Sequence, residues 1–75
     1  MKIQKDEEYE GMLLADGFEK ALLGYGFRCQ LPVAVYDYRK CIKILMKSMS
    51  EEDAEDFMNY NVLGSYVGEQ TPIFI

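Results

Sequence analysis

The sequence predicts an α+β fold, a small, mostly antiparallel sheet packed against an αα-hairpin, in a single domain over residues 11–75. A chain of 75 residues makes one domain, near the lower size limit for folding without disulfides or metals. Six Tyr and four Phe within a 49% hydrophobic composition supply a core. Strand-like runs flank two helical patterns, which is typical of segregated α and β elements.

The first third of the chain begins with a charged segment that lacks hydrophobic periodicity, so residues 1–10 are predicted to be a flexible charged arm. This segment has no apolar stretch of the secretory-signal type. Residues 12–15 are apolar and fit a short buried strand. Asp16 and Glu19 have the spacing of a helix N-cap and its N3 acid, which predicts a short helix ending at Gly24. A loop is then expected up to Pro32.

The middle of the chain carries the strongest patterns. Residues 33–36 are β-branched and aromatic and predict a strand. Asp37 then fits the N-cap of a helix over residues 38–47, whose apolar positions recur at helical spacing. Ser50 fits the N-cap of a second helix over residues 51–63, which has acidic residues in its first turn and ends at Gly64. The short connection predicts an antiparallel helical hairpin.

The last residues predict a β-hairpin, with one strand at residues 66–67 and a second at residues 72–75. The helical hairpin is expected to pack on the sheet through four mostly buried side chains: Ile42, Leu45, Phe57 and Met58.

The residue types argue against catalysis. The chain has no histidine, and Cys29 and Cys41 lack the partner cysteines that a zinc site needs. Carboxylates at positions 51–56 share helix faces, but a solvated surface explains them better than a shared cation. We therefore expect no enzymatic activity, no catalytic or metal-binding residues and no cofactor.

Charge is segregated along the chain, and this segregation gives two candidate partner-binding surfaces. Residues 20–47 carry six basic residues against one acid, and residues 48–75 carry six acids alone. The acidic surface would attract a basic protein groove, as a mimic of nucleic-acid phosphates does, and the basic one would attract nucleic acid. A net charge of −5 makes nucleic acid the less favoured partner. The candidate residues are Glu52, Glu55 and Asp56 on helix 51–63, and Arg39, Lys43 and Lys47 on helix 38–47.

Three strings, LADGFEKALLGYG, AVYDYRKCIKILM and SEEDAEDFMNYNVLGSYVGEQTPIFI, resemble a family of small tailed-bacteriophage proteins of unknown function, over about residues 9–75. The resemblance implies a cytoplasmic location, in the infected bacterial host, and assigns no site residues. Small phage proteins of this kind typically bind and modulate a host or phage protein. A protein-interaction or regulatory module is therefore the leading hypothesis, and nucleic-acid binding through helix 38–47 or phosphate mimicry through helix 51–63 is the alternative.

Two further expectations concern partners. No apolar run approaches the ~20 residues that span a bilayer, so no membrane partner is expected. A homodimer and a monomer stay equally open. In the dimer, the basic row of one copy would dock on the acidic row of another, with Ile44 and Met46 at an apolar centre.

Overall fold

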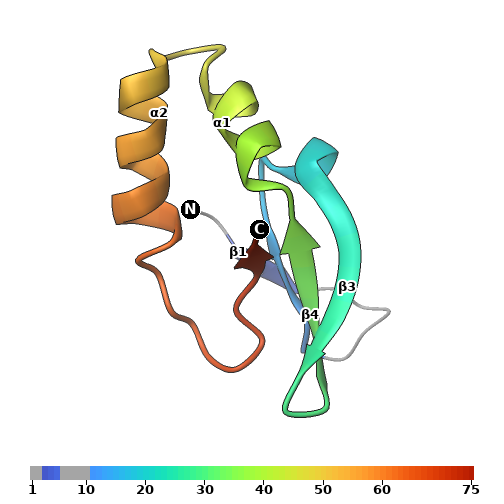
Figure 1. Ribbon diagram of the computed structural model, residues 1–75. Helices are drawn as coiled ribbons and strands as arrows, with labels where there is room; N and C mark the ends of the chain where they lie inside the picture. Colours follow the sequence, from blue (N-terminus) through green and yellow to red (C-terminus); the bar gives the residue numbers. More distant parts are fainter. Residues whose placement is uncertain (1–2, 6–10) are drawn as a thin grey trace.

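The computed structural model describes residues 3–5 and 11–75 and shows an elongated α+β molecule, 37 × 21 × 19 Å (Figure 1). The predicted fold class is confirmed. In chain order the elements are strands β1 (Ile3–Lys5) and β2 (Leu13–Ala15), the 3-10 helix η1 (Glu19–Ala21), strands β3 (Leu22–Arg28) and β4 (Leu31–Tyr36), helices α1 (Tyr38–Leu45) and α2 (Glu51–Phe57), the π-helical turn η2 (Met58–Val62) and strand β5 (Ile73–Phe74).

Strands β3 and β4 form a long antiparallel hairpin that projects away from the helices (Figure 1). Cys29 and Gln30 connect them with φ angles of 53° and 67°. Two consecutive positive φ angles are what a two-residue type I′ turn requires. The hairpin corrects the sequence prediction, because the expected loop up to Pro32 is a strand on both sides of this tight turn.

The short helix predicted after Asp16 is also wrong in extent. Only the single turn η1 forms, and residues 22 and 23 already belong to β3. Glu19 does reach back, but its carboxylate accepts a hydrogen bond from the Gly17 N–H at 3.1 Å instead of capping a longer helix. The Glu19 carboxylate therefore does accept a backbone N–H in this turn, but the helix that its spacing predicts does not form.

The last strand pairs differently from the prediction. β5 lies parallel to β4, with Val35 opposite Ile73 and Tyr36 opposite Phe74. The strand order is β3-β4-β5, so β4 is central and, among the described residues, β3 pairs only with β4. The terminal strand was predicted, but the β-hairpin with residues 66–67 was wrong, because those residues lie outside the strands.

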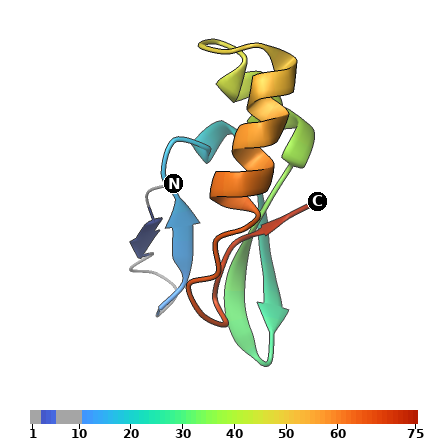
Figure 2. The same ribbon diagram turned by 90° about the vertical axis from the view of Figure 1, so that its left-hand side faces the viewer.

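A second, two-stranded sheet joins β1 and β2 antiparallel, with Ile3 opposite Ala15. β2 confirms the strand expected near residues 12–15. Of the arm predicted over residues 1–10, residues 3–5 form β1, and the other seven positions lie outside the described residues. In Figure 2 this small sheet lies at the left, beside the β3–β4 hairpin, and α2 lies above the hairpin.

Both main helices begin where the sequence predicts. Asp37 accepts a hydrogen bond from the Lys40 N–H at 3.0 Å, and Ser50 accepts one from the Asp53 N–H at 3.1 Å. Such caps satisfy N–H groups that a helix start leaves without partners. Helix α1 ends at Leu45, two residues short of the prediction, whereas α2 continues through η2 to Val62.

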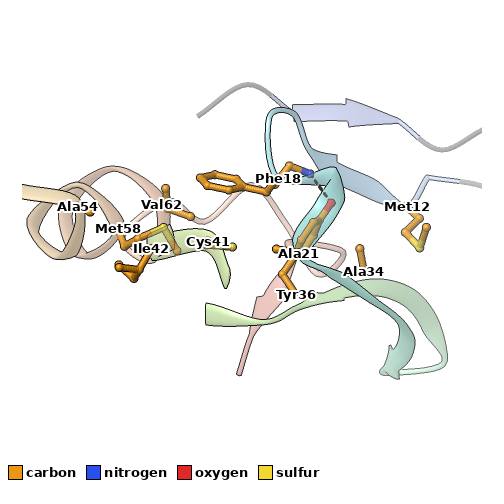
Figure 3. Close-up of a cluster of buried hydrophobic side chains, with 11 residues drawn as sticks. Met12, Phe18, Ala21, Ala34, Tyr36, Cys41, Ile42, Ala54, Met58 and Val62 are labelled. Carbon is orange, nitrogen blue, oxygen red and sulfur yellow. Dashed lines mark hydrogen bonds between the residues drawn. The ribbon is translucent and has the colours of Figure 1, made fainter. Parts of the chain in front are cut away.

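The core lies where the helical hairpin, the central strand and the β2–η1 segment meet (Figure 3). Ile42 and Met58 are fully buried, as predicted, whereas Leu45 and Phe57 are only partly buried and pack against the cluster. The fully buried Tyr36 hydroxyl accepts a hydrogen bond from the Ala15 N–H at 2.9 Å, which links the two sheets.

Candidate protein-binding surface

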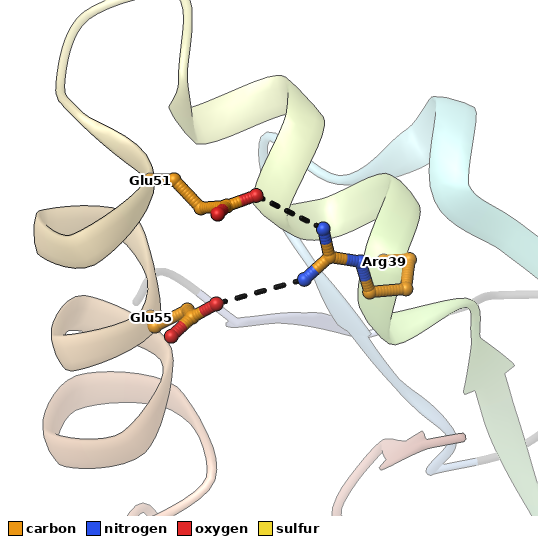
Figure 4. A network of polar contacts seen from close by, with 3 residues as sticks. All are labelled: Arg39, Glu51 and Glu55. Carbon is orange, nitrogen blue, oxygen red and sulfur yellow. Dashed lines mark hydrogen bonds and ion pairs between the residues drawn. The ribbon is translucent and has the colours of Figure 1, made fainter.

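Arg39 joins the two charged helices of the same chain. Its guanidinium lies 3.1 Å from a carboxylate oxygen of Glu51 and 3.6 Å from one of Glu55 (Figure 4). These side chains are about half exposed, so each pair contributes little, ~0–1 kcal/mol. The consequence for binding is larger: Arg39 and Glu55, predicted to serve opposite surfaces, neutralise one another within the molecule.

The basic row is further divided by the end of its helix. Lys43 is exposed on α1, but Lys47 lies beyond Leu45, in the connection to α2. With Arg39 already between two carboxylates, the row does not present three available cations on one helix face. The structure therefore brings the predicted basic residues together only in part.

The acidic helix presents a different surface, in which charge and apolar area are continuous. Glu52 and Asp56 are exposed and four residues apart, which places them on one helix face. Tyr60 follows at the same spacing with 81% of its surface exposed, and Leu63 is 46% exposed. We call this surface the acidic–aromatic face; it consists of Glu52, Asp56, Tyr60 and Leu63.

Sequence reasoning missed the apolar half of the acidic–aromatic face. The sequence does indicate that Tyr60 belongs to this face, because Tyr60 lies four residues after Asp56. Within this stretch the backbone adopts a π-helical turn, in which the Leu63 N–H donates to the Met58 carbonyl at 2.7 Å. Such turns are rare and occur frequently at functional sites. Burying Met58 and Val62 inward leaves Tyr60 directed to solvent.

Of the two cysteines, the buried Cys41 offers little reactivity. Burial raises the pKa of the Cys41 thiol to about 11, which disfavours the nucleophilic thiolate. Cys29 is exposed at the hairpin turn. Across residues 3–5 and 11–75, no three His, Cys, Asp or Glu side chains are grouped to hold a metal ion.

Comparison with protein-family models, with curated proteins and with solved structures finds no match for this chain. The resemblance to the phage family therefore stays a prediction from the sequence. Within the part of the chain that the structure describes, no helix combines the length and apolar character needed to cross a bilayer.

Proposed function

We propose that this chain is a protein-interaction module of the phage-encoded kind, which modulates a host or phage protein in the bacterial cytoplasm by placing its acidic–aromatic face in a basic groove of that protein. The observation that carries the proposal is the alignment of Glu52 and Asp56 with the exposed Tyr60 on one continuous helical surface.

The two halves of this face have different physical roles. Carboxylates at exposed positions attract a basic groove over several ångströms and raise the association rate. An exposed tyrosine supplies a large contact area with a polar tip, and such residues dominate the free energy of binding at interfaces. Tyr60 and Leu63 would therefore set the lifetime of the complex, and the acids its rate of formation.

Nucleic acid remains the alternative partner, through Lys40, Lys43 and Lys47. The contacts of Arg39 with Glu51 and Glu55 weigh against it, because they neutralise the one cation of the row that could form a bidentate phosphate contact. An acidic face that occupies a nucleic-acid-binding groove of another protein, by imitating phosphates, is a special case of the proposal and involves the same residues.

The test begins with recovery of the partner from infected-cell lysate and continues with binding kinetics on the purified pair. We expect Glu52→Lys with Asp56→Lys to lower the association rate about tenfold or more at low salt, and the loss to shrink above ~0.15 M salt. Tyr60→Ala should instead raise the dissociation rate, at an almost unchanged association rate.

The matched control reverses charge on the other helix. Lys43→Glu with Lys47→Glu changes two exposed charges and should leave binding to the protein partner nearly unchanged. If only this basic pair matters, and the wild type binds bare DNA or RNA with a steep salt dependence, nucleic-acid binding replaces the proposal.

A further inference from the structure

The longest strand of the molecule lies at the edge of its sheet. β3 has seven residues, and within residues 3–5 and 11–75 its only strand partner is β4, on one side. Its alternating residues Leu23, Tyr25 and Phe27 are 51%, 46% and 74% exposed. Edge strands of natural proteins are usually short, charged or interrupted by proline, because an open edge pairs with other strands. The only charged residue of β3 is Arg28, at the end of the strand. The pairing of β3 with β4 shifts register only between Leu22 and Gly24.

The register of the hairpin shows which backbone groups point to the open edge. Phe27 lies opposite Pro32, which has no N–H group, so these two residues cannot exchange a pair of hydrogen bonds. In agreement, the Pro32 carbonyl points to the other side of β4, where it accepts a hydrogen bond from the Gln70 side chain at 3.1 Å. Because hydrogen-bonded and non-hydrogen-bonded pairs alternate, Gly26 bonds to β4 and Phe27 directs its N–H and C=O outward.

We propose that β3 is a self-association edge, on which a second copy of this chain adds its own β3 antiparallel, with Gly26 of the two copies opposite one another on a two-fold axis. This register spans residues 24–28, where the pairing of β3 with β4 is regular. It places Phe27 of each copy opposite Tyr25 of the other, so two aromatic cross-strand pairs form on one face. The opposing glycines leave the other face without side-chain clashes.

The same strand sequence explains why the occupant is a second copy. A two-fold axis requires a surface that complements itself. The order Tyr25, Gly26, Phe27 meets this requirement, because an axis at Gly26 places an aromatic residue of one copy opposite an aromatic residue of the other on both sides. Arg28 then lies opposite Gly24 of the other copy, so no like charges meet directly despite the net charge of −5. This dimer does not involve the charged helices, where the earlier expectation placed Ile44 and Met46 at the contact; Ile44 is partly buried and packs against the core.

The contact between the two copies is small, and its area determines the affinity that we expect for the dimer. Five residues from each copy bury less than the ~1,200 Å² of a stable interface, so association should be weak and reversible. In sedimentation measurements from about 10 µM to 1 mM protein, we expect a dissociation constant on the order of 100 µM. Phe27→Lys should raise this constant at least tenfold, whereas Tyr66→Lys, at a similarly exposed residue outside the strands, should leave it unchanged.

A cysteine at position 26 tests the register. Opposing residues of a non-hydrogen-bonded antiparallel pair have Cα atoms about 4.5 Å apart, within the range that a disulfide bridges. Gly26→Cys is tolerated in the monomer, because an added Cβ would approach the Val35 side chain no closer than 3.6 Å. In a Cys29→Asn background, mild oxidation should link two copies through position 26 much faster than through a cysteine introduced at the exposed Tyr66.

Three results would overturn the proposal. They are a wild-type chain that stays monomeric at the highest concentration, a Phe27→Lys variant that associates like the wild type, and cross-linking through position 26 no faster than through position 66. Circular dichroism of each variant identifies any loss of folding, and the binding test of the acidic–aromatic face uses different residues, so the two proposals fail independently.

Discussion

Tyr36 links the two sheets through its hydroxyl and packs within its own sheet through its ring. Its hydroxyl accepts the Ala15 N–H, and its ring stacks on Phe74 with centroids 5.3 Å apart. Replacing it by phenylalanine preserves the stacking but leaves a buried N–H group without its acceptor. Tyr36→Phe should therefore lower the free energy of unfolding by about 1–3 kcal/mol. Urea denaturation measures this loss, and Tyr60→Phe, at an exposed position, should change it by less than ~0.5 kcal/mol.

Cys41 should make stability depend on pH in the alkaline range. Burial raises the pKa of its thiol from 9.0 to about 11, so the unfolded chain loses this proton at lower pH than the folded one. The stabilising contribution is complete below pH 9 and is lost as the pH rises toward 11, on the order of 2 kcal/mol in all.

Urea denaturation from pH 8 to pH 11 checks this slope, and Cys41→Ala should flatten it. Burial also raises the pKa of Tyr36, so part of the loss above pH 10 should persist in that variant. An unchanged slope between pH 9 and 10 in Cys41→Ala would contradict the assignment to the buried thiol.

The β3–β4 hairpin is the element with the clearest local strain. Cys29 and Gln30 both adopt left-handed backbone angles, which cost roughly 1–2 kcal/mol for a residue with a Cβ. Asn-Gly is the sequence that a type I′ turn prefers. Cys29→Asn with Gln30→Gly should therefore raise the free energy of unfolding by about 1 kcal/mol. Thermal denaturation measures the gain; Gln30→Ala, which keeps a Cβ, should give none.

The helices could be predicted and β3 could not, for a local reason. Asp37 and Ser50 cap their helices through contacts within three residues, so sequence spacing is sufficient to place them. In β3, Gly24 and Gly26 suggested a loop. The residues that alternate with these glycines have the period of a strand, but closely spaced glycines before a proline are a strong local signal for a loop.

Part of the candidate site could likewise be predicted from the sequence, and part could not. Glu52 and Asp56 could be placed on one exposed face from helical spacing alone. The contacts of Arg39 with Glu51 and Glu55 depend on how α1 and α2 lie against each other, which no spacing within one helix specifies. Tyr60 was within reach of the same spacing rule, but its exposure depends on which side the π-helical turn buries.

At the scale of the whole molecule, the aromatic side chain of β5 joins parts that are distant in sequence. Phe74 stacks on Tyr36 and meets Phe18 edge-on, with ring centroids 6.5 Å apart. Phe74→Ala should lower the free energy of unfolding by about 2–4 kcal/mol, because both ring contacts and buried area are lost. Phe27→Ala, at a 74% exposed ring, should cost less than ~0.5 kcal/mol in dilute solution. Equal losses in urea denaturation would contradict this view of the core.

The parallel pairing of β4 with β5 has a consequence for how fast the molecule assembles. The β3–β4 and α1–α2 hairpins close short loops, whereas Val35 meets Ile73 only after the whole helical segment has been enclosed. Long closures carry a larger entropic cost, so β5 should dock after the folding transition state. In stopped-flow measurements, Phe74→Ala should then accelerate unfolding and leave the folding rate almost unchanged, while the Asn-Gly turn accelerates folding.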